Sequence, residues 1–551
     1  MYKTFDLIAI AFFVFGLTLL RTLWYRRDQK LRRPPSPPSL PFVGNLFSMP
    51  SGTEHIAYMK LGKQLKSAQS YISHNMLGHS TIVLNSSQAA SDLFEKRSAK
   101  YSDRANSPMV RDPTLLNWPG HPGLVGYNDL WRSHRRMLNN WLNVRAAVQF
   151  HESHERQARV LLGRLLNVSN RDDPFEETEN EFFLAMASAI FRSAYGYQLQ
   201  GINDPFFQGA KEAIEHLFSA HMYTNFWVNI FPALSYVPDW FPGAGWKRTA
   251  REWREQKDWI LNSTLKWTKD QVASGSAEPS ILGALLDHKI TSKWTQEDRD
   301  YRLKELGMVL YSGGTDTSSN VLVKFVAAMV LNPHVQAKAQ QEIDAVLGPM
   351  KLPKVEDEER LPYVRNLILE TLRWHPVLPT AVPHVCYEDD VYRNYDIPKG
   401  TVLAMSRDES IYKDPEVFNP DRFLDPNVPP LPGFGWGRRK CPGSYYAQAA
   451  VFVSITSLLA MFTFEKKRDS NGQEIIPNIE DRSNSMTLGL KPFDFKFSPR
   501  SEQHRQFVEG LVPVVKKVLD HQYGGNEEGG DNEAGSEEDA QAWTEVELEL
   551  P

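Results

Sequence analysis

Three stretches of this chain have the residue pattern of helices. Residues 303–332 form the longest, about thirty helix-compatible positions opened by Thr295-Gln296-Glu297-Asp298, which is close to a capping box. Residues 444–462 carry small and apolar side chains at helical spacing, and residues 367–374 form a shorter run. The pattern therefore predicts a long helix in the middle of the chain and two more in its C-terminal half.

The N-terminus has a different pattern, an apolar run without charge from Leu7 to Leu20. With its flanks it reaches about twenty residues, broken by Asp6 and Arg21, which is enough to span a bilayer of ~30 Å. A cleaved signal peptide is the alternative, but no small-residue cleavage site follows. Five basic residues follow instead: Arg26, Arg27, Lys30, Arg32 and Arg33. We expect residues 1–25 to be a single membrane anchor with the rest of the chain in the cytosol.

Residues 26–45 predict a basic, proline-rich hinge after this anchor. Pro34-Pro35-Ser36-Pro37-Pro38 favours a stiff, extended backbone. A second membrane contact is indicated where aromatic residues alternate with prolines from Phe226 to Trp246 and are followed by Lys247 and Arg248. An aromatic loop within the core is the alternative for that segment.

The C-terminal end shows three successive patterns. Phe493, Phe495 and Phe497 alternate with other residues as in a strand. Residues 501–523 suggest an amphipathic helix, and residues 524–551 hold ten Asp/Glu and no Lys/Arg, which predicts a disordered acidic tail. The formal net charge of −5 depends on this tail, so it says nothing useful about partners.

Length and composition favour one large domain over residues 46–500. A chain of 551 residues allows several domains, but no linker-like stretch divides this range. The two cysteines argue against a disulfide framework and suit a reducing compartment. Cys386 lies in an apolar stretch and is most simply a buried small hydrophobe. No basic aromatic patch or zinc-ligand spacing indicates nucleic-acid binding.

The other cysteine, Cys441, lies in the glycine-rich loop Phe434-Gly435-Trp436-Gly437-Arg438-Arg439-Lys440-Cys441-Pro442-Gly443. Glycines let the backbone turn tightly and approach a flat object. Arg438, Arg439 and Lys440 place positive charge beside the sulfur, and the predicted helix from Ser444 adds a partial charge, so both favour a metal-binding thiolate. A buried structural cysteine is the alternative for a lone Cys. Because the pattern F-x-x-G-x-R-x-C-x-G is met throughout, the loop resembles the haem-binding loop of cytochromes P450.

The resemblance extends to a helix with Glu370-Thr371-Leu372-Arg373 and to Asn419-Pro420-Asp421-Arg422-Phe423. Glu370 and Arg373 share one helix face. In the family such a pair joins the later arginine, here Arg422, in a buried network. A carboxylate between two guanidiniums is satisfied bidentately, and losing one member leaves a charge unpaired. The resemblance implies structural roles for these three residues.

The centre of the long predicted helix is unusual: Ser312-Gly313-Gly314-Thr315-Asp316-Thr317-Ser318-Ser319. Glycines cost a helix interior roughly 1 kcal/mol each, and hydroxyl groups compete for backbone carbonyls. The segment resembles the family's acid–alcohol pair, which implies that Asp316 and Thr317 serve dioxygen binding and proton delivery. A kinked helix without chemistry is the alternative.

A third match is Trp131 and Arg135, four residues apart on a predicted helix. By resemblance they hold a haem propionate together with Arg439, and Phe434 joins the cofactor contacts. His384 stands where the family often has another propionate-binding residue, and an ordinary satisfied histidine is the alternative there. The resemblance covers residues 34 to 500 or so.

These similarities imply a mainly α fold with small β-sheets, the cytochrome P450 fold, preceded by one transmembrane helix. They imply a monooxygenase with haem b, with Cys441 as the axial iron ligand, that hydroxylates or epoxidises a lipophilic small molecule. NADPH would act indirectly, through a separate cytochrome P450 reductase, with cytochrome b5 as a further partner. The expected location is the endoplasmic reticulum membrane, with a single pass and a cytosolic catalytic domain. The sequence as a whole resembles those of fungal members of the family that modify secondary metabolites.

Two other functions remain open from the sequence. A haem-thiolate isomerase or dehydratase would consume no electrons, but the intact Asp316-Thr317 pair counts against it. A non-catalytic haem-binding protein has no need of a groove for oxygen. Substrate contacts are expected from Ala105 to Gly126, from Leu378 to Val382 and from Met486 to Leu488.

Overall fold

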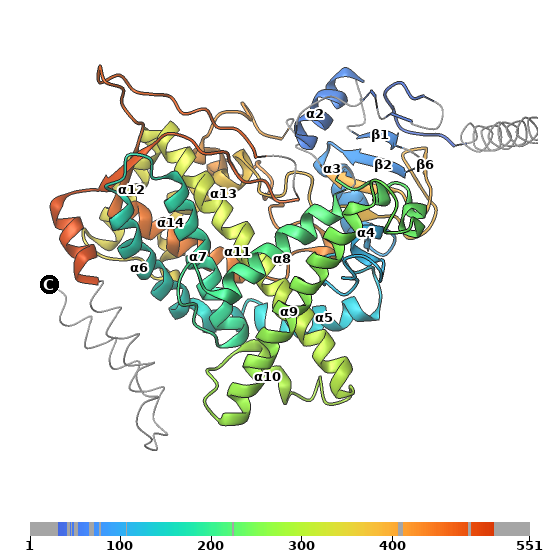
Figure 1. Ribbon diagram of the computed structural model, residues 1–551. Coiled ribbons are helices and arrows are strands. Elements are labelled where there is room, and N and C mark those ends of the chain that lie inside the picture. Colours follow the sequence, from blue (N-terminus) through green and yellow to red (C-terminus); the bar gives the residue numbers. More distant parts are fainter. Residues whose placement is uncertain are drawn as a thin grey trace, which may run out of the picture.

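The computed structural model describes residues 31–40, 44–45, 47–48, 53–65, 71–76, 79–105, 107–222, 225–405, 411–482 and 486–511. Within them the protein is mainly helical with small sheets, as predicted (Figure 1). The predicted anchor at residues 1–25 and the acidic tail at residues 524–551 lie outside the described residues.

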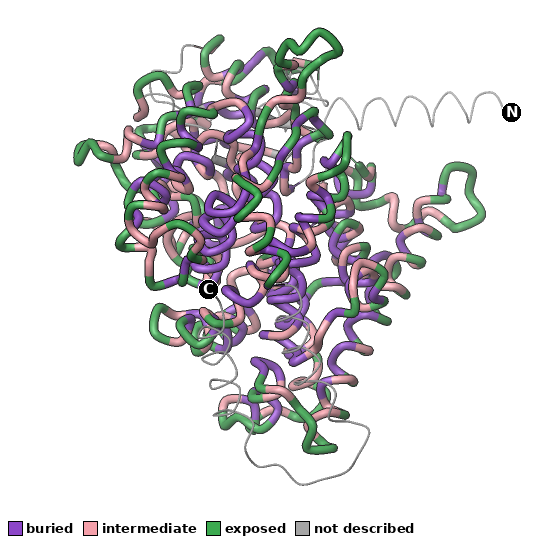
Figure 2. The backbone as a smooth tube through the Cα atoms, turned by 90° about the vertical axis from the view of Figure 1, so that its left-hand side faces the viewer, coloured by how far each residue is buried: buried purple, intermediate pink, exposed green. Residues whose placement is uncertain are grey.

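The described helices are α2 (Glu54–Gln64), α3 (Ser87–Ala90), α4 (Pro108–Arg111), α5 (Asp129–Leu142), α6 (His151–Val168), α7 (Phe175–Tyr195), α8 (Pro205–His221), α9 (Gly245–Ser274), α10 (Ile281–Leu286), α11 (Gln296–Leu331), α12 (Pro333–Leu347), α13 (Pro362–Trp374) and α14 (Ser444–Met461). Short helical turns lie between them: η1 (Ser91–Lys96), η2 (Ala146–Phe150), η3 (Trp227–Asn229), η4 (Pro232–Tyr236), η5 (Val355–Arg360), η6 (Pro420–Leu424) and η7 (Gly437–Arg439). Figure 2 shows that the buried residues gather in the central helices.

Helix α11 runs through the centre of the molecule. Its N-cap is Thr295, whose hydroxyl accepts a hydrogen bond from Asp298 N at 3.2 Å, as the capping pattern predicted. The helix spans 36 residues and ends where Pro333 starts α12. Its second half is buried against α7, α13 and α14, with Phe325 and Ala327 fully covered.

Helix α14 is apolar on all sides and lies in the core. In the described part of the chain it is the one helix whose length and composition suit a membrane span, but 83% of that window is buried inside the protein. It packs against α6 and α11. A helix that is hydrophobic all round is expected in such a position, so α14 is a core helix.

The largest sheet has five strands in the order β1-β2-β7-β4-β3. Its strands are β1 (Tyr71–Met76), β2 (His79–Leu84), β3 (Asp103–Arg104), β4 (His384–Val385) and β7 (Val402–Met405). Strand β2 is parallel to β7 and the other pairs are antiparallel. The register pairs Arg104 with His384, so residues 280 positions apart become neighbours.

Two smaller sheets are hairpin-like pairs, β5 (Asp390–Tyr392) with β6 (Tyr395–Ile397) and β8 (Phe462–Glu465) with β9 (Lys496–Pro499). The strand predicted from the alternating phenylalanines begins only at Lys496, so of the three only Phe497 lies in it. Phe493 and Phe495 are buried in the core without strand pairing. Their alternation reflects burial on one side of an extended segment, and residues 502–511 are helical.

A buried ionic network ties α13 to η6. Arg373 donates from Nε to Glu370 Oε2 at 2.7 Å and from Nη2 to Oε1 at 2.9 Å. Arg422 Nε lies 3.0 Å from both oxygens, and Asn419 N donates to Oε1 at 2.7 Å. The Glu370 side chain is fully buried, and the remaining guanidinium donors reach the backbone carbonyls of Lys413, Pro415 and Val417. The carboxylate and both guanidiniums are therefore all hydrogen-bonded, with one carboxylate shared by two cations.

We predict that Glu370→Gln destabilises the protein by about 3–5 kcal/mol, because it leaves two buried guanidiniums without their counter-charge. Calorimetric melting at a fixed scan rate checks this. Glu359→Gln is the matched control, since Glu359 is exposed on η5. Equal melting temperatures for the two variants would contradict the network's role.

Candidate active site

The centre of α11 is a continuous helix that leaves one face open. Gly313 is exposed although Ser312 and Thr315 beside it are buried, and a side chain added at Gly313 would meet no atom within 4 Å. Thr317 lies one turn further on the same face and donates a hydrogen bond from Oγ1 to Gly313 O at 2.6 Å. The second glycine has a packing role, because a side chain at Gly314 would collide with Ile190.

Asp316 lies on a different face of α11 from Thr317. Asn320 Nδ2 donates to its backbone carbonyl at 2.8 Å and to its Oδ1 at 3.4 Å, whereas the buried Oδ2 has no hydrogen-bond partner. Burial raises the pKa of Asp316, and the Thr487 hydroxyl and Lys324 oppose that shift. No hydrogen bond joins Asp316 to Thr317 among the described residues, because adjacent helix positions do not face each other.

The loop before α14 holds Cys441 in a tight turn. Cys441 N donates to Phe434 O at 2.9 Å, and Gly435 and Gly437 have φ of 78° and 55°, which favour glycine. Gly437 also needs to lack a side chain because a Cβ there would collide with the backbone carbonyl of Phe94. The Cys441 residue is exposed, and α14 begins at Ser444 as predicted.

The electrostatic environment of Cys441 differs from the sequence-based expectation. Burial among protein atoms raises the pKa of its thiol, while the Gly443 N–H, Arg135 and Lys440 lower it. Arg438 instead donates to the Tyr127 hydroxyl, and Arg439 donates to Ser102 O and Val125 O at 2.8 Å each. The expectation that Arg438 and Arg439 act on the sulfur was wrong, because backbone carbonyls and a tyrosine engage them. A bound metal removes a thiol proton outright, so the site needs no free thiolate.

Three arginines gather near this loop. Arg104 donates from Nη1 to Val382 O at 2.7 Å and to Pro383 O at 2.9 Å, and the guanidinium of Arg439 lies 4.6 Å from the Trp131 ring centre. Arg135 lies 5.8 Å from the same ring and influences the Cys441 thiol. Within the described ranges, no carboxylate forms an ion pair with any of the three.

Burial and the repulsion between neighbouring positive charges both lower the pKa values of Arg104 and Arg439. Burial holds the pKa of Arg104 well below its usual value, and Arg439 lowers it further. Burial lowers the pKa of Arg439 to about 10, although Asp103 opposes the shift. Clustered cations of this kind are stabilised by an anion with several oxygen atoms. A flat cofactor that carries carboxylates and a metal for Cys441 therefore fits the residues present.

His384 does not clearly belong to this anion site. Its Nδ1 donates to Tyr101 O at 2.6 Å, and the ring lies against Phe94 at a tilt of 34°, with centres 4.3 Å apart. Burial holds the pKa of His384 well below its usual value, so the ring is neutral and has no second donor. The structure favours the alternative of a satisfied buried histidine.

Sequence reasoning missed Arg104 and His121. Arg104 reaches the cluster only through the pairing of β3 with β4, and no local pattern signals that contact. His121 Nε2 lies 3.2 Å from Ser312 Oγ and so links the 118–124 segment to α11. His121 lies in the run Gly120-His121-Pro122-Gly123, within a segment already predicted to contact substrate. That context was the signal available from the sequence.

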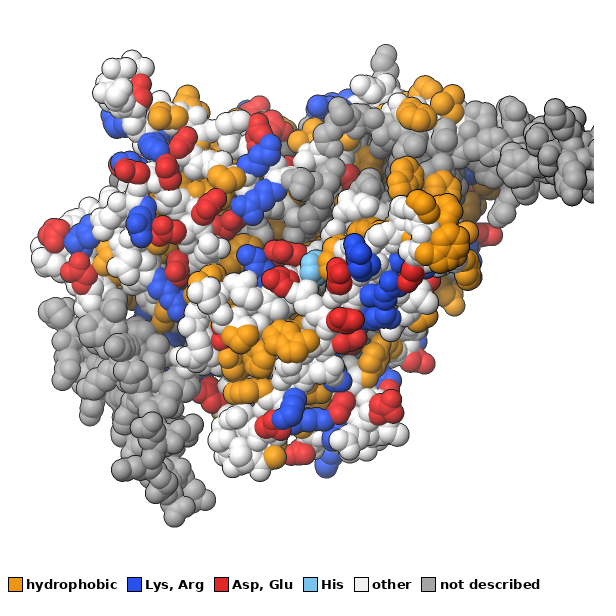
Figure 3. Space-filling view, in the orientation of Figure 1, with side chains coloured by type: hydrophobic (Ala, Val, Ile, Leu, Met, Phe, Trp, Pro, Cys, Tyr) orange, Lys and Arg blue, Asp and Glu red, His pale blue; other side chains and the backbone are white. Residues whose placement is uncertain are grey.

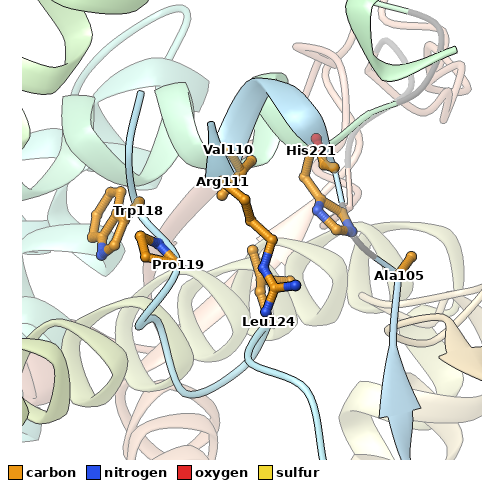
Figure 4. Close-up of a pocket in the computed structure, with 8 residues that line it drawn as sticks. Ala105, Val110, Arg111, Trp118, Pro119, Leu124 and His221 are labelled. Carbon is orange, nitrogen blue, oxygen red and sulfur yellow. The ribbon is translucent and has the colours of Figure 1, made fainter. Parts of the chain in front are cut away.

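A small pocket adjoins that segment. Arg111 from α4 and His221 from α8 extend into the same space, with Trp118 and Pro119 on its other side and Leu124 below (Figure 4). Burial lowers the pKa of His221 to about 4, and the charges of Arg104 and Arg111 lower it as well. The pocket lies within the predicted substrate loop, residues 105–126.

The chain is similar to known proteins over most of its length. The family model "Cytochrome P450" matches residues 34–497. A cytochrome P450 monooxygenase from Armillaria gallica is 34% identical over 510 residues, covering 90% of this chain and 98% of the relative. A tryptamine 4-monooxygenase from Psilocybe cyanescens is 33% identical over 518 residues, covering 90% and 99%. Cytochrome P450 monooxygenase 98 from Postia placenta is 34% identical, covering 89% and 95%.

If Cys441 is the axial ligand, Cys441→Ser abolishes the red-shifted Soret band that carbon monoxide gives with the reduced protein, because a hydroxyl does not replace the thiolate. Cys386→Ser is the control and retains the band, since the Cys386 thiol donates to Glu388 O at 2.8 Å away from the loop. The opposite pattern would show that the ligand is misassigned.

Proposed function

The chain belongs to the cytochrome P450 family, and from that premise we propose that it is a membrane-anchored monooxygenase that hydroxylates or epoxidises a lipophilic small molecule. Family membership makes it a haem b monooxygenase supplied with electrons by a reductase. The observation that carries the proposal is the Cys441 thiol near Arg135, which clusters with Arg104 and Arg439; the three arginines lack ion-pair partners among the described residues.

In this proposal Cys441 binds the haem iron, and the three arginines with Trp131 hold the propionates. When bound, haem with a thiolate ligand supplies oxygen activation and O–O bond cleavage. Asp316 would connect the oxygen site to solvent protons, and burial raises the pKa of its carboxyl group. Thr317 would position dioxygen at the open face of α11, where its hydroxyl donates to Gly313 O.

Fungal secondary metabolism is the proposed setting. The relatives come from several fungi, and one is named for its action on tryptamine. The proposed electron donor is a separate NADPH–cytochrome P450 reductase, with cytochrome b5 as a second partner.

The proposed membrane contact rests on an exposed aromatic patch after α8. Figure 3 shows hydrophobic side chains gathered at the right-hand side of the molecule, over this segment. The patch consists of Trp227, Phe231, Tyr236, Trp240 and Phe241, of which Tyr236 is 88% exposed. The exposure of these rings favours the membrane contact over an aromatic core loop, whereas Phe226 and Trp246 at the ends of the segment pack against the core. Aromatic rings at this density suit the headgroup level of a membrane.

Lys247 does not take part in that contact. Its Nζ donates to Ser235 O at 2.9 Å and to Val237 O at 2.8 Å, so it braces the patch from inside. Arg248 beside it has an exposed side chain, 3.9 Å from Glu252 Oε1, that would face lipid phosphates.

Thr317→Ala tests the proposed oxygen chemistry. We expect normal haem binding but more hydrogen peroxide released per NADPH consumed, because proton delivery of this kind contributes roughly 10²–10⁴-fold. The assay uses protein reconstituted with a reductase. Thr315→Ala is the control, since Thr315 is buried on another face of α11. Equal peroxide yields in wild type and Thr317→Ala would favour the electron-free isomerase function.

The proposed topology predicts that protease added to sealed microsomes digests the catalytic domain, because the basic residues after position 25 hold it on the cytosolic side. The measurement is an immunoblot with and without detergent. Asn85, Asn167 and Asn262 each lie in an N-x-S/T sequon. Protection from protease, together with a glycosidase-sensitive mass at one of these sequons, would overturn this topology.

A further inference from the structure

Helix α5 and the loop before α14 form one continuous surface. The guanidiniums of Arg132 in α5 and Arg438 in the loop lie 4.7 Å and 5.4 Å from the centre of the same ring, that of Tyr127. Arg439 of the loop lies 4.6 Å from the ring centre of Trp131 in α5. Contacts between cations and aromatic rings therefore join two elements that are far apart in the sequence.

Positive charge dominates this surface. Residues 127–150 and 434–443 together hold seven Arg/Lys and one carboxylate, that of Asp129. Asp129 forms an ion pair with Arg132 at 2.7 Å and so neutralises one of the seven. The adjoining turn η1 has two acidic residues and one lysine, which leaves the balance clearly positive. A surface of this kind attracts an acidic partner.

The cations lie where another chain segment can reach them. Arg136 is exposed one turn after Arg132 on α5, Arg145 is exposed just after the helix, and Arg438 and Lys440 are exposed in the loop. Apart from Arg132, none of them forms an ion pair with a described residue. These five residues are called the basic face below.

Apolar side chains are exposed beside the basic face. Val144 and Val148 follow α5 and are 57% and 54% exposed, and Tyr445 follows the loop and is 47% exposed. The ring centres of Phe150 and Tyr446 lie 5.2 Å apart, which brings the two segments together. The surface therefore suits a segment that carries both carboxylates and apolar side chains.

The chain contains one such segment, outside the described residues. Residues 524–551 hold ten Asp/Glu and no Lys/Arg. Within them, Trp543-Thr544-Glu545-Val546-Glu547-Leu548-Glu549-Leu550 alternates acidic and apolar residues. In an extended backbone, alternate side chains point to opposite sides. The pattern therefore predicts three carboxylates on one side and apolar groups on the other.

This segment is long enough to reach the basic face. Leu511 is the last described residue, and the chain between it and Trp543 can extend up to ~105 Å at about 3.3 Å per residue. A domain of this size has a radius of gyration of about 23 Å. The length of the connection therefore does not restrict which face of the domain the segment contacts.

We propose that residues 543–550 dock on the basic face of the same molecule, with their three glutamates beside its cations and their apolar side chains beside Val144 and Val148. Each exposed ion pair contributes little by itself, and salt screens it. Tethering within one chain raises the local concentration of the segment to about the millimolar range, so weak contacts suffice. Docking is therefore reversible and depends on salt.

The docked segment would cover the approach to Cys441. This consequence rests on the proposed function, in which a reductase supplies electrons to haem bound at that residue. A protein that delivers electrons there has to approach the same loop, and an acidic segment already on the basic face competes with it. The tail is thus a competitor of the electron donor that belongs to the chain itself.

Carbodiimide cross-linking of the full-length, haem-loaded protein tests the docking, because the reagent joins a carboxylate only to an amine in contact with it. We expect Lys440 to be cross-linked to Glu545, Glu547 or Glu549, as identified by mass spectrometry of peptides. The yield should fall severalfold at ~1 M salt, where the Debye length is ~3 Å. Lys351 is the matched control, an exposed lysine after α12 without an ion pair to any described residue.

The triple variant Glu545→Gln, Glu547→Gln, Glu549→Gln tests the competition. At low salt we expect its KM for the reductase to be lower than that of the wild type by on the order of threefold, with kcat unchanged, because a tethered competitor only raises the donor concentration that is needed. Lys440→Arg keeps the charge of the basic face but has no amine, so it should lose the cross-link and retain the wild-type KM.

The outcomes separate the docking from the proposed function. No cross-link at Lys440, or an equal yield at Lys351, overturns the docking. A yield that rises with protein concentration shows binding between copies and also overturns it. An unchanged KM in the triple variant overturns the competition. The cross-link needs no turnover, so it stands even if Thr317→Ala shows that the oxygen chemistry is wrong.

Discussion

The structure depends on one fully buried carboxylate, that of Glu370. Two guanidiniums and a backbone N–H surround it, and the same guanidiniums fasten the carbonyls of residues 413–417 to α13. This segment leads into the loop that carries Cys441. An ionic group without water is costly, so the network is stable only when complete. The segment before the Cys441 loop is therefore held against α13 only when all three charged side chains of the network are present.

The molecule treats its other buried charges differently. Around Trp131 the arginines have carbonyl partners but no described carboxylate, so their positive charge is left for a ligand to neutralise. The buried Lys324 amine donates to Pro376 O at 3.1 Å. A shared carboxylate therefore marks the structural charges around Glu370, and the lack of one marks the arginines available to a ligand.

Local patterns could be read from the sequence, and long-range ones could not. The cap at Thr295, the pairing of Glu370 with Arg373 and the start of α14 depend on residues within four positions of one another. Arg104 depends instead on a strand pairing 280 positions away, and Arg438 and Arg439 turn toward Tyr127, Ser102 and Val125. Burial decides these cases, and one sequence does not show burial.

The contact between Gly437 and the Phe94 carbonyl has a consequence for the order of assembly. The two residues are about 340 positions apart, and the loop that carries Cys441 is shaped by that contact. Closing so long a segment is slow, because the chain loses entropy before any contact rewards it. The cysteine loop therefore acquires its final shape only after the chain has been synthesised beyond Gly437 and this residue has reached Phe94. Haem therefore binds late in assembly, because the cysteine loop is incomplete until this contact has formed.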